Sequence, residues 1–342
     1  MFLKREPLIS VCVPVYDTEP CLEQCLRSAA EQDFDNFEIV VVSDASRGKN
    51  ARGWKAKKIV KAVQKQSDKE RRQKGLARVP IKFIEHSENR GLVEARRTLV
   101  REACGKWIAM LDSDDVMEAG ALCTMHAAAL ESGADIVHGA STAGVFNKDG
   151  EFTPAGQNVY GNITYGILEG HDIFSSWIME WKLTSNTWGK LILRDLFVRA
   201  YENIPYIECN FAEDVLLFFF ISLNAVRYIG IQDKVYRYRL NVGMTSARKI
   251  DTMRKWRMIC SAASVFTAIS QWVEEDGGRV KPDELERIRA MARGYLANNL
   301  RQYYETVVPE LQEEAYAMLC EYWGEGFVKK VDAAMNPARG DK

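Results

Sequence analysis

Short apolar runs alternate with longer amphipathic segments through the first 140 residues of the chain. The runs are rich in β-branched residues and bounded by turn residues, as is typical of strands, and they span 8–15, 37–43, 81–86, 106–111 and 135–140. Segments of helical length and periodicity lie between them, over 19–32, 51–76, 91–104 and 117–132. This alternation predicts an α/β fold with a mostly parallel central sheet flanked by helices. In such sheets, ligands bind beyond the carboxyl ends of the strands.

The pattern changes in the second half of the chain. Segment 141–170 is rich in Gly, Asn and Thr without a sustained period, which indicates irregular structure or a small hairpin. Helices are expected over 170–181 and 194–202 and from Asp214 onward, and a late strand is expected over 235–239. Helical patterns then span 247–276, 282–305, 308–323 and 326–335. We therefore expect an α/β domain over 1–243 and a helical C-terminal region over 244–342.

Composition narrows the class of protein. The 342 residues are 47% hydrophobic and 27% charged, which suits a globular protein and excludes disordered and collagen-like chains. With 46 basic and 47 acidic residues the net charge is 46 − 47 = −1, so no overall field favours nucleic acid as a partner. The densest apolar segment, 215–226, has 12 residues, whereas roughly 20 span a bilayer, so no transmembrane helix is expected.

The cysteines and the first residues bear on the compartment. Eight cysteines are scattered without a CxxC pair, and several lie inside apolar runs, as is typical of reduced, buried thiols in a cytosolic protein. No secretory signal peptide is expected, because the first apolar run is short and interrupted by Pro14. These features predict a cytoplasmic protein.

Positive charge is concentrated in one segment. Between Arg47 and Lys82 there are 14 basic and two acidic residues, a net charge of 14 − 2 = +12. One interpretation is a long amphipathic helix whose solvated face is basic. The other is a surface that docks on anionic lipid or on a phosphate-bearing acceptor, which would place the protein at the inner face of a membrane. The sequence leaves both open.

Several common cofactor motifs are missing. No GxGxxG follows the first predicted strand, and Trp54 stands where the lysine of a phosphate-binding loop would follow Gly48 and Gly53. The chain has four scattered histidines and no HExxH, which argues against a histidine-rich metal site. Dinucleotide-dependent, P-loop and zinc-peptidase chemistry therefore lose their main support.

A dense carboxylate cluster, LDSDD at 111–115, follows the fourth apolar run. Carboxylates this close repel one another unless a cation neutralises them, and oxygen ligands favour Mg²⁺ or Mn²⁺. The alternative is an acidic turn that caps the next helix, because Asp is a favourable N-cap residue.

Polar residues also follow the other predicted strands. Asp17 lies in PVYDTEP (14–20) and Asp44 in VVSDAS (41–46), and Gly91 opens a helix in HSENRGLVEARR (86–97). Later segments read NTWGKLILRDLF (186–197), FAEDVLLFF (211–219) and VYRYRLNVGMTS (235–246). Together with LDSDD and in this order, they resemble the family 2 glycosyltransferases, nucleotide-sugar enzymes of GT-A fold. The resemblance spans roughly 8–246. Three positions depart from the usual motifs of this family. Asp17 stands where Asn is common, Ala45 stands where Gly is common, and Trp188-Gly189 lengthens the motif in segment 186–197.

This resemblance implies a set of nucleotide-sugar contacts. Asp44 would accept a hydrogen bond from the uracil ring, and Asp112 would reach the ribose or the metal. Asp114, with Asp112, would coordinate a divalent cation, Mn²⁺ or Mg²⁺, that bridges the diphosphate. Trp188 would offer a stacking platform to donor or acceptor. The remaining implied donor contacts are Pro14, Val15, Asp17, Arg90, Arg96, Ser113 and Arg239.

The resemblance also implies an inverting mechanism. Asp214 matches the catalytic carboxylate that deprotonates the acceptor hydroxyl, and its neighbour Glu213 is the alternative base. Helix capping is the structural explanation for the same two acids.

The implied activity is transfer of a hexosyl or N-acetylhexosaminyl group from a UDP-sugar to a glycan or lipid-linked acceptor, as in polysaccharide biosynthesis. Two other functions stay open, a sugar nucleotidyltransferase and a non-catalytic binding module of GT-A type. The first usually carries a Gly-rich basic N-terminal loop, which PVYDTEP lacks. The second is disfavoured because Asp44, Asp112, Asp114 and Asp214 are all present.

Overall fold

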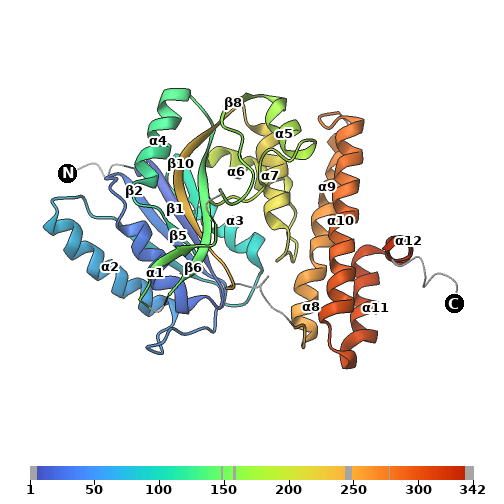
Figure 1. The fold of residues 1–342 in the computed structure, drawn as a ribbon. Helices are drawn as coiled ribbons and strands as arrows, with labels where there is room; N and C mark the ends of the chain where they lie inside the picture. The colour runs from blue at the N-terminus through green and yellow to red at the C-terminus, as the bar shows by residue number, and fades with distance from the viewer. Residues whose placement is uncertain (1–5, 148, 157–158, 243–248, 277, 336–342) are drawn as a thin grey trace. The chain divides into compact units, whose positions relative to one another are not determined.

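A computed structural model describes residues 6–147, 149–156, 159–242, 249–276 and 278–335 (Figure 1). By internal contacts the chain divides into two compact units. The first comprises 1–203 and 217–243, and the second comprises 204–216 and 244–342. Segment 204–216 therefore clusters with the C-terminal helices, although it precedes the last strand in the sequence. Each unit is described by itself.

One sheet organises the first unit, with the strand order β3-β2-β1-β4-β9-β6-β10-β5. Pairing is parallel among β1, β2, β3 and β4 and between β6 and β10, while β9 is antiparallel to both β4 and β6. The mostly parallel sheet expected from the alternation is confirmed. The strands are β1 (Ile9–Val15), β2 (Phe37–Ser43), β3 (Ile81–Glu85), β4 (Trp107–Met110), β5 (Val116–Met117), β6 (Ile136–Phe146), β9 (Lys190–Leu193) and β10 (Arg227–Arg239).

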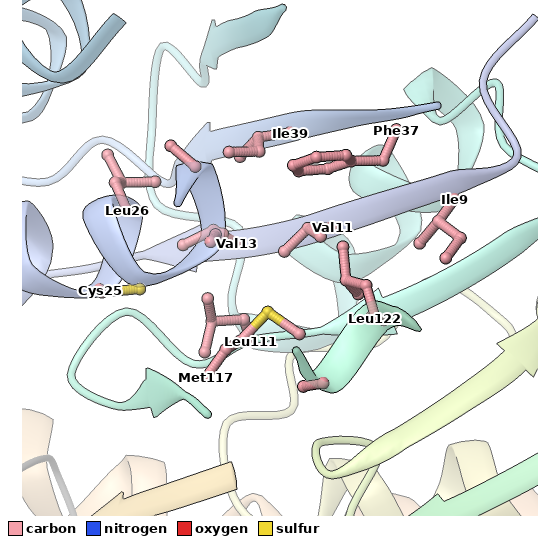
Figure 2. Close-up of a cluster of buried hydrophobic side chains, with 14 of the residues drawn as sticks. Ile9, Val11, Val13, Cys25, Leu26, Phe37, Ile39, Leu111, Met117 and Leu122 are labelled. Carbon is pink, nitrogen blue, oxygen red and sulfur yellow. The ribbon is translucent and has the colours of Figure 1, made fainter. Parts of the chain in front are cut away.

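Helices cover both faces of this sheet (Figure 1). On one face, Val11 and Val13 of β1 pack with Leu26 of α1 and Leu122 of α4, and Figure 2 shows this cluster. Burying each such side chain contributes about 1.5–3 kcal/mol. Helix α3 packs against β1 and β2. The helices of this unit are α1 (Glu19–Ala30), α2 (Ala56–Gln73), α3 (Leu92–Glu102), α4 (Ala121–Ser132), α5 (His171–Ile178) and α6 (Arg194–Asn203).

Segment 141–170 is more ordered than its composition predicts. β6 runs on to Phe146 and pairs with β7 (Phe152–Pro154), which realises the small hairpin. β8 (Gly166–Glu169) pairs antiparallel with β10. The helix expected from residue 117 begins at Ala121 instead, because 116–117 pair with β10 as β5.

The second unit is helical. The apolar side chains of its helices pack into one core, which includes the fully buried residues Trp256, Leu296, Leu300 and Leu319. The pattern at 247–276 is divided in the structure, since α8 ends at Cys260 and α9 begins at Ala262; its residues 247–248 lie outside the described part. The elements are α8 (Met253–Cys260), α9 (Ala262–Asp276), α10 (Pro282–Thr306), a 3₁₀ turn (Pro309–Leu311), α11 (Gln312–Trp323) and α12 (Glu325–Met335). Helix α7 (Glu213–Asn224) begins in this unit and continues in the first.

Two further expectations concern thiols and membranes. All eight cysteines are free thiols; Cys12, Cys25, Cys209 and Cys260 are buried, whereas Cys104 and Cys123 are exposed. Among the described helices, none has the length and hydropathy needed to span a bilayer.

Candidate active site

Three loops meet at the carboxyl edge of the sheet, where β1, β2 and β4 end. The backbone N–H of Asp44, directly after β2, donates to Val15 O at 3.0 Å. The N–H of Leu111, after β4, donates to Cys12 O at 3.0 Å. The loops that carry Asp17, Asp44 and the acidic cluster are therefore neighbours, as the topology requires.

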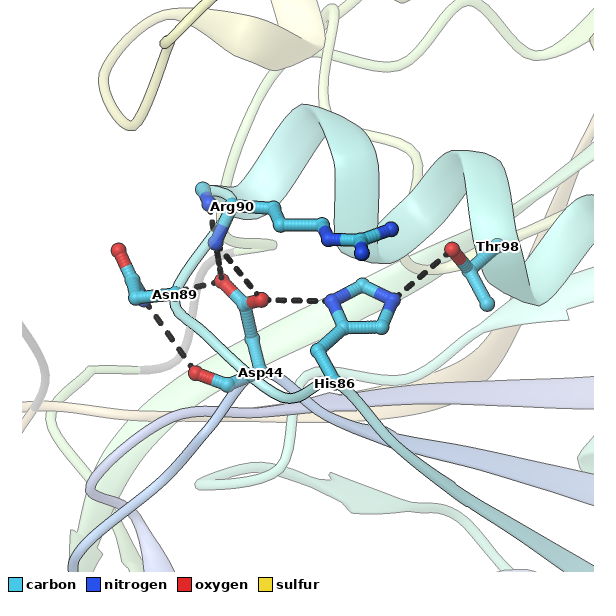
Figure 3. A network of polar contacts seen from close by, with 6 residues as sticks. Asp44, His86, Asn89, Arg90 and Thr98 are labelled. Carbon is cyan, nitrogen blue, oxygen red and sulfur yellow. Dashed lines mark hydrogen bonds and ion pairs between the residues drawn. The ribbon is translucent and has the colours of Figure 1, made fainter.

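Asp44 is the centre of a buried hydrogen-bond network (Figure 3). Its carboxylate accepts from the backbone N–H of Arg90 at 2.9 Å and of Gly91 at 2.9 Å, and from the side-chain amide of Asn89 at 2.9 Å. His86 Nδ1 lies 2.7 Å from Asp44 Oδ1, and its Nε2 lies 3.0 Å from the Thr98 hydroxyl. The network fixes loop 86–91 on the end of β2 and accounts for the burial of a charged group.

Gly91 lets this loop turn tightly. Its φ of 88° is in the left-handed region, which glycine adopts without steric cost, and α3 begins at the next residue. The Arg90 side chain, by contrast, is exposed and projects from the loop (Figure 3).

Asp17 ties the first loop to the second. Its carboxylate accepts from the backbone N–H groups of Arg47 and Gly48, both at 3.1 Å, and its own N–H donates to the Ser46 hydroxyl at 2.9 Å. The Ser46 hydroxyl also donates to Glu19 Oε1 at 2.6 Å. Asp17 thus shapes the loop after β2, a role that sequence did not assign to it.

The acidic loop 111–115 is held from three sides. Arg96 of α3, only 2% exposed, donates to Asp112 Oδ1 at 3.0 Å. The hydroxyls of Thr18 and Ser113 lie 2.6 Å apart, which joins this loop to the loop after β1. The fold therefore brings Arg96, Asp112 and Ser113 close together.

The pKa values of Asp114 and Asp115 are raised above the ordinary value for aspartate. Burial, followed by the nearby Asp112 carboxylate, raises the pKa of Asp114 to about 6. Burial and the charges of Asp114 and Asp112 raise the pKa of Asp115 to about 8. The Tyr236 hydroxyl donates to Asp115 Oδ2 at 2.8 Å, and the backbone N–H of Arg239 donates to Oδ1 at 2.7 Å. Asp115 is thus the buried anchor of the loop, whereas Asp114 is half-buried.

Arg239 connects the end of β10 to the acidic loop. Its Nε donates to Asp114 O at 2.6 Å, and its Nη2 donates to Gln24 Oε1 of α1 at 2.6 Å. Its guanidinium lies 4.0 Å from the centroid of the Phe146 ring. Arg239 therefore lies at the predicted site, where it fixes the loop through backbone and amide oxygens.

An aromatic stack lies beside Asp115. The Trp188 ring is stacked on Tyr236, with centroids 4.8 Å apart, and on Tyr238 at 5.5 Å. Tyr160 continues the stack onto Tyr238 at 4.8 Å and is 41% exposed. Trp188 is thus half-buried between aromatic neighbours, and Tyr160 is the most exposed ring of the group.

The donor set of the acidic loop fits a hard divalent cation. In the described part of the chain, no group of three or more His, Cys, Asp or Glu side chains has the geometry of a metal site. Asp112 and Asp114 nevertheless offer carboxylate oxygens on one loop, where burial and then the charge of Asp112 raise the pKa of Asp114. Such oxygen donors suit Mg²⁺ or Mn²⁺ completed by substrate phosphates.

Asp214 and Glu213 belong to the second unit. They form the first turn of α7, after Ala212, whose φ is 65°. The N–H of Val215 donates to Asp214 Oδ1 at 2.9 Å, so the Asp214 carboxylate accepts a backbone hydrogen bond within the first turn of α7. Burial, followed by the charges of Asp214 and Glu213, raises the pKa of Tyr295. Both acids thus have the helix-terminal position that either interpretation of them requires.

Two of the predicted donor contacts, Pro14 and Val15, are buried residues of β1. The structure also brings to this site residues that the sequence analysis did not single out. His86, Gln24, Tyr236 and Tyr160 have no place among the predicted site residues, although the segments HSENRG and VYRYR contain two of them. Asp115 lies within LDSDD, but only the fold reveals that its carboxylate is buried.

The sequence has relatives among known proteins. The model of the family described as Glycosyl transferase family 2 matches residues 10–186. Glycosyltransferase GlyA of Streptococcus pneumoniae is 29% identical over 243 residues, which cover 70% of this chain and 31% of GlyA. Glycosyltransferase GlyG of the same organism is 25% identical over 254 residues, covering 71% of this chain and 74% of GlyG. The chain thus spans less than a third of GlyA.

Solved structures share the fold. S. aureus TarS 1–349 in complex with UDP-GlcNAc aligns over 98% of this chain and 93% of its own, with a TM-score of 0.54 and 19% sequence identity. At this identity the likeness establishes the architecture alone.

Proposed function

The chain belongs to glycosyltransferase family 2, and on that premise we propose that it transfers a hexosyl or N-acetylhexosaminyl group from a UDP-sugar to a hydroxyl of a glycan or lipid-linked acceptor, with inversion. Nucleotide-sugar glycosyl transfer follows from the family. The UDP donor, the acceptor class and the stereochemistry are proposed. Because TarS is described in complex with UDP-GlcNAc, UDP-GlcNAc is the first donor to test.

The observation that carries the proposal is the acidic loop at the carboxyl edge of the sheet. Asp112 and Asp114 lie beside the loops that Asp17 and Asp44 organise, and their carboxylates lie close enough for the charge of Asp112 to raise the pKa of Asp114, after the larger effect of burial. We propose that these two residues hold Mn²⁺ or Mg²⁺. When bound, the cation would stabilise the negative charge that develops on the UDP leaving group. Arg96 positions Asp112 for this role, and Tyr236 and Arg239 position the loop through Asp115.

The nucleotide is proposed to lie over the loops after β1 and β2, in contact with the exposed Arg90 side chain. Both oxygens of Asp44 already accept hydrogen bonds, from four residues in all. A uracil N–H bound to Asp44 therefore has to displace one donor. Arg90 and Gly91 donate through backbone N–H groups and the His86 side chain is buried, so the exposed Asn89 side chain is the donor that can rotate away. The stacked Trp188, with Tyr160 and Tyr238, would offer an apolar face to a sugar ring.

Asp214 is proposed as the general base, with Glu213 as the alternative. The carboxylate would accept the proton of the acceptor hydroxyl as that oxygen attacks the anomeric carbon and UDP departs. We propose that nucleotide-sugar chemistry belongs to 1–243 and that 244–342 form a helical region with a separate role, although segment 204–216, which holds Asp214, clusters with those helices. The free cysteines support a cytoplasmic setting, and polysaccharide biosynthesis is the process in which such an enzyme would act.

A donor panel tests this function. Purified protein would be incubated with UDP-, GDP- and TDP-sugars, with Mn²⁺ or EDTA, and nucleotide release measured. Release from one or more UDP-sugars that depends on Mn²⁺ is expected. Release confined to GDP- or TDP-sugars would overturn the UDP assignment, and formation of a nucleotide sugar from a sugar phosphate and UTP would favour a nucleotidyltransferase. If no donor reacts, calorimetric titration with UDP shows whether the protein binds this nucleotide, and no binding would overturn the UDP assignment.

A further inference from the structure

The basic segment forms one exposed surface along α2. Of its 14 basic residues between Arg47 and Lys82, all but Arg71 are exposed. Arg71 turns inward and donates to the backbone oxygens of Ala77 and Gln32 at 2.6 and 2.8 Å. The burial pattern thus separates one arginine that holds the fold from a solvent-facing array of cations. Figure 1 shows α2 at the margin of the first unit, beyond α1.

Neighbouring acids neutralise only part of this array. Arg52, Arg78 and Lys82 are each ion-paired, to Glu23, Asp68 and Glu102. Within the described residues, no ion pair involves Lys57, Lys61 or Lys65, which recur every four residues and so lie on one side of the helix. These three lysines therefore form, along one side of α2, a row of cations without a direct ion pair to any described residue.

The three lysines border a groove of mixed polarity, in which Val60, Ile81 and Phe83 are the apolar residues. The groove lies between α2 and the edge strand β3, with a volume of about 520 Å³, and is lined by Lys57, Lys61, Lys65, Val60, Gln64, Asp68, Ile81, Phe83 and Glu85. Near the start of the helix, the Trp54 ring lies 3.8 Å from the Arg52 guanidinium and 4.4 Å from Lys58 Nζ. Cations over apolar and aromatic groups are a common arrangement at the boundary between water and lipid.

We propose that the α2 surface docks this protein on an anionic lipid bilayer. Four to eight clustered Lys or Arg residues on an amphipathic helix are a typical signature of attraction to anionic lipid. Nucleic acid is the weaker alternative, because the groove is lined by lysines, apolar residues and two acids rather than by a set of arginine forks aimed at bases. Binding there would leave the acidic loop, on different elements, to act on the donor.

Vesicle co-sedimentation tests the docking directly. Full-length protein would be mixed with phosphatidylcholine vesicles containing 0 or 30% phosphatidylglycerol. We expect binding only to the anionic vesicles, falling as salt rises from 50 to 500 mM. Because one basic residue contributes about fivefold to such binding, Lys57→Gln/Lys61→Gln/Lys65→Gln should lower the partition coefficient by on the order of a hundredfold. Lys106→Gln/Lys249→Gln/Lys330→Gln, exposed lysines elsewhere, should bind like the wild type.

Equal or absent binding to both vesicle types would overturn the proposal, as would equal losses in the two triple variants. Binding to a DNA duplex in a mobility-shift assay, without binding to the anionic vesicles, would assign the surface to nucleic acid instead. Melting curves of both triple variants confirm that lost binding does not reflect unfolding. UDP affinity, measured in parallel, should be unchanged in both variants, so failure of docking and failure of the proposed activity are separable.

Discussion

At the scale of single residues, the three carboxylates of loop 111–115 differ in their partners and in their burial. Asp112 is ion-paired to Arg96, Asp115 is buried under Tyr236 and the Arg239 backbone, and Asp114 is left half-buried between them. The acidic cluster was visible in the sequence. These differences were not, because the partners Arg96, Tyr236 and Arg239 are 16 to 125 positions away along the chain and only the fold brings them near.

The raised pKa of Asp114 predicts a pH dependence of cation binding. The cation requires ionised carboxylates, so protonation of Asp114 competes with it. The pKa of Asp114 is about 6, so at pH 5 Asp114 is protonated in roughly nine-tenths of the molecules. Lowering the pH from 7 to 5 should therefore weaken Mn²⁺ binding about tenfold. Isothermal titration with Mn²⁺ across this range measures the effect.

The same shifts predict the sign of the stability change. The folded pKa values of about 6 and 8 lie above the ordinary value near 3.9. The stability from Asp114 and Asp115 is therefore fully present below about pH 4 and is lost as the pH rises through 6 and 8. Mn²⁺ should raise the melting temperature more at pH 8 than at pH 5. Asp114→Asn is the control, and an unchanged pH response in that variant would contradict the assignment.

Asp214 allows a separate test of chemistry. Asn keeps the shape of Asp and can still accept from the Val215 N–H. Asp214→Asn should therefore lower turnover 10²- to 10⁴-fold, which is about 3–5 kcal/mol of barrier. UDP affinity and melting temperature should be nearly unchanged. Steady-state kinetics with an active donor and acceptor pair measure this. Glu213→Gln is the matched variant. If it loses most activity while Asp214→Asn keeps more than about a tenth, the base is Glu213.

At the scale of elements, sequence predicted the strands that carry the strongest pattern. β1 and β2 are continuous β-branched runs and were placed within one residue. β9 was missed, because a lysine and three apolar residues ahead of a helix carry no strand signal of their own, and the pairing of β9 with β4 and β6 is tertiary. β10 extends from Arg227 rather than from 235, since register shifts around Lys234 interrupt its alternation.

The loop after β2 provides an element-scale prediction. A Cβ at Gly48 would lie 1.9 Å from Oε2 of Glu19. The Glu19 side chain is fully buried, and its Oε1 accepts from the Ser46 hydroxyl. Gly48→Ala should therefore displace Glu19 and this loop and destabilise the protein by about 1–3 kcal/mol, as urea unfolding measures. Gly156→Ala, with open space around it, should be neutral. Glu19→Ala should restore part of the loss when combined with Gly48→Ala; no restoration would contradict the clash.

At the scale of the whole molecule, the chain is two compact units whose boundary does not follow the sequence. Segment 204–216 contacts the C-terminal helices, with the Asn210 N–H bonded to Ser261 Oγ at 3.0 Å and Phe211 beside Tyr295. The composition shift near residue 243 gave no sign of this, because the segment is short and its partners lie about 50 residues or more away. The proposed base Asp214 and the proposed cation ligands therefore lie in different units.

The central claim is that Asp112 and Asp114 form a cation site for the diphosphate of the donor. Calorimetric titration of UDP in Mn²⁺ and then in EDTA tests it most directly. We predict that affinity falls at least about tenfold, or 1.4 kcal/mol, in EDTA. Asp114→Ala in Mn²⁺ should match the wild type in EDTA, and Asp149→Ala, an exposed acid elsewhere, should match the wild type in Mn²⁺. Equal UDP affinity in Mn²⁺ and EDTA, with Asp114→Ala losing only melting temperature, would contradict the account.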